Sequence, residues 1–315
     1  MSTNRYLGQD PILTNQALAY ENDNYVAEDF LPSAPVATQS GKHWIYDRGR
    51  FRPSKNGGVR AEGARSEEVL HEFTTGLPYF AEDHAKKVFV TDEEDENAKA
   101  TGRDPFSDAT DHVTEIQLVD REVEAASILT TTGNYASGHV EALAGGDQWS
   151  DYGNSTPIQD VHAAIQTIHS KLFVDANKIL LPKQVFTVLQ DHPDFLERAK
   201  YTQLGVVTTD LLARIWGVDQ VVVAGAGKNT ARAGQTDSMG YIWGKNVVIS
   251  YVNPSQGEKV LTFGRNYQWK SAIVERLRGT DEQDRRGTYV RRGDHYYDQR
   301  IVSNEAGFLF TSAVA

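Results

Sequence analysis

The stretch ANKILLPKQVFTVLQDHPDFLERAKY, residues 176–201, orders its apolar and turn residues as a strand, a helix and a stop. The apolar run 179–181 is typical of a buried strand, and a helix begins near Pro182. That helix ends at Asp-His-Pro-Asp, residues 191–194, because a proline cannot continue a helix. The same four residues resemble a metal or acid–base cluster, but a helix stop with a turn is favoured. The stretch therefore predicts a compact lobe of short strands and helices.

The residues on either side extend this lobe. Thr156 and Gln159 form a capping box with Pro157 between them, which predicts a helix. Its single apolar stripe consists of Ile158, Val161, Ile165, Ile168 and Leu172. Farther along, residues 208–217 (TTDLLARIWG) predict a second helix with threonine caps and a terminal glycine. Strands are then predicted within DQVVVAGAGKNT (219–230) and NVVISYV (246–252).

Glycines follow the first of these strands and raise the question of a nucleotide site. A dinucleotide fingerprint needs a third glycine where Thr230 stands. A P-loop needs a glycine at Val222 and a hydroxyl at Asn229. We therefore expect the glycines to turn the chain out of a central strand of the lobe. A nucleotide-binding enzyme that uses the loop Gly225–Lys228 remains a weaker alternative.

The composition excludes several classes of protein. The 315 residues include 39% hydrophobic residues and no cysteine, so disulfides, cysteine-based zinc sites and thiol nucleophiles are absent. No run approaches the roughly 18–20 apolar residues of a membrane span, and the first residues lack a signal pattern. The net charge of −11 argues against a protein whose main task is to grip a polyanion. A cytosol-like compartment is expected.

Residues that could carry catalysis or bind a metal do not form a recognisable pattern. His162 and His169 are seven residues apart on one predicted helix, about 10.5 Å along its axis, which is too far to share a metal ion. The acidic run TDEEDEN (91–97) lacks the alternating ligands of a calcium loop, and no Gly-x-Ser-x-Gly elbow occurs. We therefore predict no catalytic residue, no metal site, no cofactor and no enzymatic activity.

Outside the lobe, the chain divides into segments of different texture. Residues 1–40 are polar and lack a sustained period, which predicts an extended arm. Residues 41–80 hold two strand-like runs around a Gly- and Arg-rich middle, which predicts a long, open hairpin. The longest helical pattern covers residues 107–132, and Gly133 follows it. Its apolar positions are Val113, Ile116, Val119, Val123 and Ala126.

The carboxy-terminal part reads as strands and a turn. Strands are predicted within KVLTFGRNYQW (259–269) and AIVERLRG (272–279). The polar stretch GTDEQDRRGTYVRRGDHYYD (279–298) predicts a turn region. A last strand within residues 300–315 is expected to end the chain.

Charge is distributed very unevenly between two of these segments. Residues 41–65 carry seven Lys or Arg and two acidic residues, a net charge of +5. Residues 81–124 carry fourteen Asp or Glu and five basic residues, a net charge of −9. This contrast suggests complementary contact between copies of the chain. Two solvated faces without mutual contact remain the other interpretation.

The whole order of elements resembles the major capsid protein of tailed bacteriophages (Caudoviricetes) with the Hong Kong 97-type fold. The axial-domain sequence of those proteins is similar to an ordered series of segments in this chain: WSDYGNSTPIQDVHAAIQTI (149–168), then residues 176–201, 208–226 and 240–252. The resemblance implies an α+β fold with the following parts: an N-terminal arm (1–40), an extended loop (41–75), a peripheral domain (76–154) with a spine helix at about 107–132, an axial α/β domain (155–255) and a return to the peripheral domain (256–315).

The resemblance also implies a function and partners. Copies would self-assemble as hexamers and pentamers into an icosahedral shell around packaged double-stranded DNA, which they contact non-specifically. A scaffolding protein, a portal and a decoration protein are the further partners, and no membrane is involved. Because the arm starts at once, either a separate scaffold acts or a leader has been removed. The expected location is the virion, after assembly in the host bacterial cytoplasm; an encapsulin-like cellular shell remains the alternative.

Two sets of residues are candidates for contacts between subunits. The basic hairpin is expected to lie over the acidic segment of a neighbour, and a loop of the axial domain is expected to face its symmetry mates near the capsomer axis. The hairpin candidates are Arg48, Arg50, Arg52 and Arg60, and their partners are Asp92, Glu93, Glu94, Asp95 and Glu96. The candidates at the axis are Lys228 and Arg232.

Overall fold

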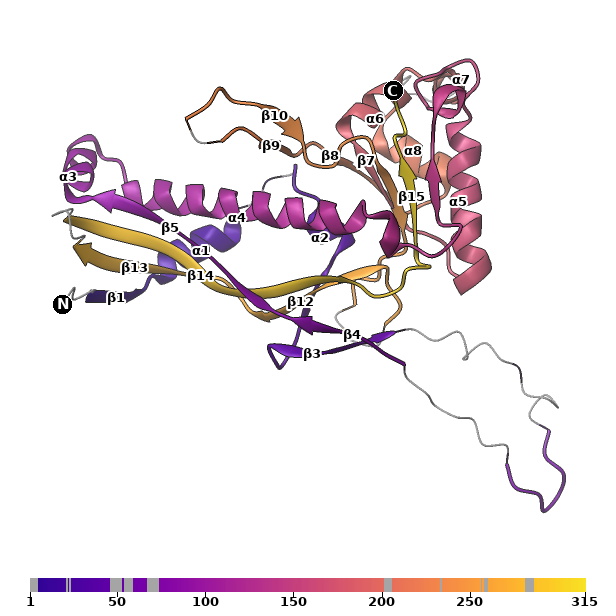
Figure 1. Cartoon of the computed structure of the whole chain (residues 1–315), viewed down its shortest axis with the longest axis horizontal. Coiled ribbons are helices and arrows are strands. Elements are labelled where there is room, and N and C mark those ends of the chain that lie inside the picture. Colours follow the sequence, from indigo (N-terminus) through magenta and orange to yellow (C-terminus); the bar gives the residue numbers. More distant parts are fainter. Residues whose placement is uncertain are drawn as a thin grey trace.

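The computed structural model describes residues 5–20, 22, 24–45, 53, 59–66, 74–200, 206–232, 234–255, 257, 260–280 and 286–315. Two separate sheets, each covered by helices, make up most of the described chain, so the mixed α and β class is confirmed. Figure 1 shows the long helix α4 running along one sheet toward the lobe that holds the other. Within the described residues, no helix has the length and apolar character that crossing a membrane requires.

The long helix α4 is Pro105–Leu129, 25 residues, close to the predicted range 107–132. It begins at Asp104, whose Oδ1 accepts a hydrogen bond from the Phe106 N–H at 3.0 Å. It ends at Thr130, whose hydroxyl donates to the Ala126 carbonyl at 2.7 Å. The prediction that Gly133 ends the helix is wrong, because Gly133 lies one turn later in the short 3-10 helix Thr132–Asn134.

The larger sheet lies against α4 and has six strands. Its order is β1-β13-β14-β12-β2, and β5 pairs with the free side of β14. The strands are β1 (Arg5–Gln9), β2 (Ser33–Pro35), β5 (Glu82–Thr91), β12 (Gly264–Lys270), β13 (Ile273–Thr280) and β14 (Arg286–Ile301).

The central strand of this sheet is β14, which contradicts the predicted polar turn at residues 279–298. Its 16 residues pair with β5 on one side and with β13 and then β12 on the other. Along β14, polar and charged residues stand between buried apolar ones such as Val290, and some of them, such as Arg292, are themselves buried. The many charged residues and glycines at positions 279–298 made this strand resemble a polar turn in the sequence.

The smaller sheet has five strands in the order β6-β15-β11-β7-β8. They are β6 (Val140–Ala142), β7 (Lys178–Pro182), β8 (Gln220–Ala224), β11 (Val247–Ser250) and β15 (Gly307–Thr311). β8 pairs in parallel with β7 alone, so the predicted central strand of valines is an edge strand. β15 confirms the predicted last strand.

Helices cover one face of this smaller sheet and form its main core. They are α5 (Pro157–Leu172), α6 (Lys183–Gln190), α7 (Pro193–Ala199) and α8 (Thr209–Trp216). Pro157 starts α5 as predicted, but the capping box does not form, because the Thr156 hydroxyl donates instead to the Asp160 carboxylate at 3.1 Å. A 3-10 turn at Gly145–Asp147 precedes this group.

The amino-terminal segment is not an extended arm in the structure. It contains β1, the helix α1 (Pro11–Ala19), the short helix α2 (Ala27–Phe30) and β2. Leu13 and Ala17 are buried against Val90, Val274 and Val290 of the sheet. The prediction of an arm without regular structure is therefore wrong for these residues, because their few apolar side chains pack on the chain's own α4 and sheet.

Two hairpins and a helix project from this framework. β3 (Ser40–Ile45) and β4 (Thr74–Phe80) pair antiparallel at the base of the predicted extended loop. Residues 59–66 lie far beyond them at one end of the molecule (Figure 1). β9 (Gly227–Asn229) and β10 (Met239–Tyr241) form a hairpin that leaves the smaller lobe, and α3 (Asp92–Thr101) lies at the opposite end.

Candidate functional site

Groups typical of an active site do not come together in the described part of the chain. No cluster of three or more His, Asp or Glu residues there could hold a metal ion. The His192 ring is buried and lies 3.1 Å from the Ser155 hydroxyl, and it caps the first turn of α7. His169 Nδ1 lies 2.8 Å from Asp175 Oδ1, and His162 Nε2 lies 3.2 Å from the Ile215 carbonyl. These contacts hold helices in place.

The glycines at residues 225–228 serve the protein's own chain. A Cβ atom at Gly225 would lie 2.9 Å from the Asn24 side-chain oxygen, so glycine allows the amino-terminal segment to approach here. Gly227 then starts β9, and the chain continues into a hairpin. A phosphate cradle needs a helix amino terminus after the glycines, and this turn lacks one.

The β9–β10 hairpin is stabilised from within by one side chain. The Asn229 side-chain oxygen accepts from the Ala231 and Ser238 N–H groups at 2.9 and 3.1 Å, and its amide donates to Asp237 at 2.7 Å. Met239 and Tyr241 are 73% and 48% exposed on it. The candidates Lys228 and Arg232 both belong to this projecting element, at β9 and in the turn after it.

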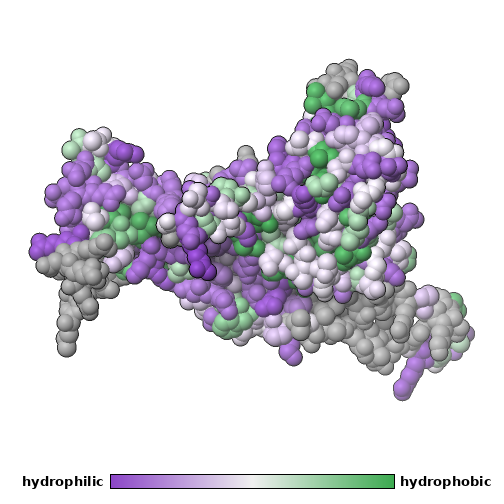
Figure 2. All heavy atoms as spheres, turned by 45° about the horizontal axis from the view of Figure 1, so that its top comes forward, coloured by the Kyte–Doolittle hydropathy of each residue, from purple (hydrophilic) through white to green (hydrophobic). Residues whose placement is uncertain are grey.

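The acidic candidates lie on α3, which buries none of its residues. Asp92 forms an ion pair of 2.6 Å with Arg278, and Asp95 forms one of 2.8 Å with Lys99. The side chains of Glu93, Glu94 and Glu96 have no ion-pair partner within the described ranges. Figure 2 shows a largely hydrophilic surface at this end of the molecule, so three carboxylates there remain available for another chain.

Most of the basic candidates cannot be placed. Arg48, Arg50 and Arg52 lie outside the described residues. Arg60 is exposed, and its guanidinium donates to the Ala64 carbonyl at 3.2 Å. The described segment 59–66, to which Arg60 belongs, and α3 lie at opposite ends of the molecule (Figure 1), so the chain does not bring them together within one subunit.

An apolar surface lies at the tip of the lobe, beside α7. Leu196 and Val206 are its exposed members among the described residues. Figure 2 shows a hydrophobic patch at this tip, besides others elsewhere on the same face. The lobe therefore offers two projecting ends, this tip and the β9–β10 hairpin.

Sequence reasoning missed a set of carboxylates along α4 that hold the amino-terminal segment. Gln16 donates to Asp111 at 2.8 Å, and the Tyr20 and Tyr25 hydroxyls both donate to Glu115. The acceptors follow a spacing of four residues, which puts them on one face of the helix. That spacing is visible in the sequence, but nothing in the sequence names the partners.

Glu122 makes the most enclosed of these contacts. Its carboxylate accepts from the Val26 and Ala27 N–H groups at 3.1 and 2.9 Å and from the Trp243 indole at 2.6 Å. Burial raises the pKa of Glu122, and the three donors oppose that shift. One side chain therefore joins the amino-terminal segment, α4 and the chain that follows β10.

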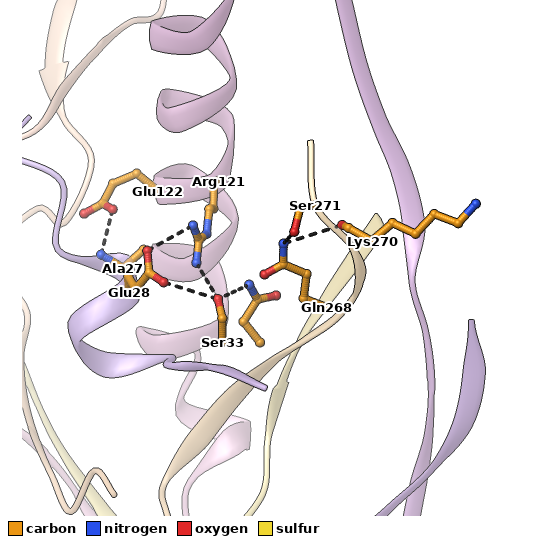
Figure 3. Close-up of polar contacts among 9 residues, drawn as sticks. Ala27, Glu28, Ser33, Arg121, Glu122, Gln268, Lys270 and Ser271 are labelled. Carbon is orange, nitrogen blue, oxygen red and sulfur yellow. Dashed lines mark hydrogen bonds and ion pairs between the residues drawn. The ribbon is translucent and has the colours of Figure 1, made fainter. Parts of the chain in front are cut away.

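The preceding residue, Arg121, continues this junction on the other side. Figure 3 shows Arg121 and Glu122 leaving α4 toward the amino-terminal segment. Arg121 lies 3.4 Å from the Glu28 carboxylate and donates to the Ser33 hydroxyl at 3.4 Å. Ser33 also accepts from the Asn266 amide at 3.1 Å, which links the junction to β12.

Comparison with known proteins gives similarity over the whole chain. No family model matches it. The major capsid protein of Pseudomonas phage JBD67 is 28% identical over 311 residues, 97% of each chain. The major capsid protein of Burkholderia phage BcepMu is 27% identical over 249 residues, 79% of this chain and 78% of the relative.

Solved structures also match nearly the whole length of the chain. The crystal structure of a phage-related protein from Bordetella bronchiseptica RB50 has a TM-score of 0.77 and 26% identity, and the match covers 97% of both chains. The capsid structure of the cyanophage P-SCSP1u has a TM-score of 0.61 at 8% identity, over 93% of this chain and 89% of that one. The second match concerns the fold alone.

Proposed function

We infer that this chain is a phage major capsid protein with the Hong Kong 97-type fold, because its sequence and its fold match such proteins over nearly their whole length. The resemblance read from the sequence is thereby confirmed. We propose that its copies assemble as hexamers and pentamers into an icosahedral shell around packaged double-stranded DNA. The observation that carries this function is the 28% identity to a major capsid protein over 97% of both chains.

Electron microscopy of the purified full-length protein tests assembly directly. We expect uniform closed shells, because many symmetry-related contacts of modest strength add up in a closed particle. A stable monomer at high concentration, with no shells under any salt condition, would overturn the proposal. The nucleic-acid content of particles from infected cells then separates a DNA-filled phage shell from an encapsulin-like shell that holds a protein cargo.

Further partners follow from the same proposal. A scaffolding protein, a portal and a decoration protein would act during or after assembly in the host cytoplasm, and the mature location would be the virion capsid. The predicted division into extended loop, peripheral domain and axial domain stays part of the proposal, and the amino-terminal segment is no longer proposed as an extended arm. One feature supports the axial domain: the helices α5–α8 and the strands β7, β8 and β11 all lie between residues 155 and 255 and contribute most of one core cluster. The same sheet also includes β6 and β15 from outside that range.

We also propose that the extended loop of one subunit contacts α3 of its neighbour. The support is the charge contrast, the position of segment 59–66 far from α3 of its own subunit, and the three carboxylates of α3 that have no ion-pair partner among the described residues. The double variant Arg50→Glu/Arg52→Glu is expected to lower the yield of shells at moderate salt. The compensating pair Glu93→Arg/Glu94→Arg should restore part of it, because opposite charges are then paired again.

A control separates this contact from a general effect of charge. Lys171→Glu, on an exposed position of α5, changes the net charge by the same amount per site without touching the loop. Normal shells with normal thermal stability in the Arg50→Glu/Arg52→Glu variant would exclude the contact. So would an equal loss of assembly with Lys171→Glu.

The position of Lys228 and Arg232 near the capsomer axis remains a proposal, supported by the hairpin's projection from the lobe. The chain has no cysteine, so single cysteines can be crosslinked on a clean background. Arg232→Cys with a short bifunctional maleimide should give a ladder of oligomers up to the size of one capsomer ring. Leu196→Cys probes the other projecting end of the lobe. A ladder from Leu196→Cys together with dimers alone from Arg232→Cys would show that the lobe is oriented the other way.

A further inference from the structure

A cavity of about 260 Å³ lies between α4 and the sheet strands β5 and β14. Its wall is largely polar and carries several cationic or imidazole groups. These groups are Arg121 of α4, His84 and Lys86 of β5, and Arg292 and His295 of β14. The wall also includes the neutral Gln117 of α4 and the carboxylates of Asp83 and Asp120. The proposed function uses none of these residues.

Arg292 is the central feature of this cavity. It is only 6% exposed, and the guanidinium's hydrogen-bond partner is the neutral side-chain oxygen of Gln117. Its Nε has no hydrogen-bond partner in the part of the chain that the structure describes, and no carboxylate there pairs with it. Burial and the nearby Arg121 lower the pKa of Arg292 to about 10. A buried cation without a counter-charge is unfavourable, and a bound anion would remove that cost.

The acidic groups around the cavity are already paired with other cations. Asp120 forms an ion pair of 3.0 Å with Lys86, and Asp83 lies 3.5 Å from Arg291. Arg121 uses two of its nitrogens for Glu28 and Ser33, and its Nε is buried without a described partner. The interior of the cavity therefore keeps an excess of positive charge.

The backbone around Arg292 holds the cavity in a fixed shape. The pairing of β14 with β5 shifts register between Arg292 and His295, and Asp294 in that bulge has a φ of +57°. The Gln117 amide donates to the His84 and Arg292 carbonyls at 2.9 and 3.0 Å. The helix is thus bound to both strands at the place where β14 bulges.

We propose that this cavity binds a small oxoanion of the phosphate class, with the Arg292 and Arg121 guanidiniums as its ligands. A guanidinium offers paired N–H donors that match the oxygens of phosphate. A cavity of 260 Å³ has room for an ion that occupies the space of a few water molecules, each about 30 Å³. The bound anion would supply the missing counter-charge and link α4 to β14. This inference does not depend on the proposed shell.

Thermal unfolding of the full-length protein tests the site. The melting temperature is measured at pH 7.5 in low-millimolar phosphate and in chloride of equal ionic strength. At a phosphate concentration about 100 times Kd, we expect an upward shift of about 5 °C in the wild type. Arg292→Gln should abolish the shift. Arg214→Gln is the control: this exposed arginine lies on α8 of the smaller lobe and is not part of the cavity wall, so its loss should leave the phosphate shift unchanged.

A second measurement covers the case in which Arg292→Gln does not fold. Crystals of the wild type soaked in arsenate should show anomalous density between the two guanidiniums. The inference is overturned by an equal shift in Arg292→Gln, by no shift in the wild type, or by an empty cavity in the arsenate map. It is also overturned if a map of the assembled protein shows the carboxylate of a second copy in the cavity.

Discussion

Glu122 is the residue on which three parts of the chain meet, because the carboxylate is enclosed by donors from the amino-terminal segment and from Trp243. Trp243→Phe removes one of these donors and should cost about 1.5–3 kcal/mol, as expected for a buried hydrogen bond to a charged group. A double-mutant cycle with Glu122→Gln should give a coupling energy of about 1–2 kcal/mol in urea denaturation. Trp269→Phe is the control. The Trp269 ring packs on Tyr296 of β14 and not on Glu122, so this substitution should show no coupling with Glu122→Gln.

His295 predicts a dependence of stability on pH. Burial first, and then the charges of Arg292 and Arg121, lower the pKa of His295 to about 3, below its ordinary value of about 6.5. A histidine with a lowered folded-state pKa contributes stability above pH 6.5 and loses that contribution as the pH falls toward 3. Its cross-strand neighbour His84, whose pKa is also lowered by burial, acts in the same direction despite Glu82, Asp83 and Asp120.

The measurement compares the wild type with His295→Gln between pH 7 and pH 5, where most carboxylates stay charged. The wild type should lose up to about 1.4 kcal/mol of unfolding free energy per pH unit below 6.5, and the variant should lose less. Parallel curves for the two proteins would show that His295 is not held neutral in the folded state.

At the residue scale, the sequence predicted that α4 is a helix but did not predict which of its side chains are buried. The apolar stripe expected on the long helix included Ile116, Val119 and Val123, and all three are only partly buried in α4. The buried face contains Thr110, Thr114, Gln117 and Glu122 instead. Glu122 and Gln117 reach the interior here because they meet backbone groups of the amino-terminal segment and of two strands, whereas the Thr110 hydroxyl donates to the Phe106 carbonyl of its own helix. Periodicity carries no record of those tertiary partners.

Among the elements, α1 makes the clearest departure from the predicted arm. Leu13 is 5% exposed in a core shared with α4 and the sheet, whereas Leu18 on the same helix is 59% exposed. Leu13→Ala should therefore cost about 2–5 kcal/mol of unfolding free energy, and Leu18→Ala less than about 0.5 kcal/mol. Denaturant titration of the unassembled subunit measures both. Equal effects of the two variants would mean that α1 does not pack on its own subunit in solution.

Elements with one strong period were predicted well, and elements that depend on partners were not. The lobe sequence at residues 157–224 predicted α5, β7, α6, α8 and β8 because caps, prolines and apolar runs agree there. It did not predict α7, which begins at Pro193, in the stretch interpreted as a helix stop and turn. β14 was missed because polar and charged residues, such as Arg291, stand between its buried apolar ones. The edge position of β8 was missed because strand order is set by pairing, which a single strand's composition does not reveal.

At the scale of the whole molecule, one core joins the two sheets. Ile179 and Leu180 are neighbours in β7, and each is fully buried, but they face different clusters. Leu180 packs in the cluster that contains Phe30, Leu31 and the end of α4, while Ile179 faces the helices α5–α8. The second cluster therefore connects the smaller lobe to the amino-terminal segment and the long helix.

Hydrogen exchange on two matched variants tests this connection. Leu180→Ala and Ile179→Ala should each cost about 2–5 kcal/mol. Leu180→Ala is expected to speed exchange in the last turns of α4 and in residues 26–31, and Ile179→Ala should leave those amides unchanged. If both variants affect the same amides, the two sides of the sheet are not separate cores.

β14 also gives the subunit a direction in which it resists being stretched. Its 16 residues run as the middle strand of the larger sheet, and antiparallel hydrogen bonds stand perpendicular to the strand. A pull along β14 loads these bonds in shear, so that many must fail together. A force that separates β9 from β10 breaks the few hydrogen bonds between these strands one after another. The subunit is therefore expected to be stiff along its long helix and compliant at the projecting hairpin, and in the proposed shell a tension directed along α4 would pass through β14.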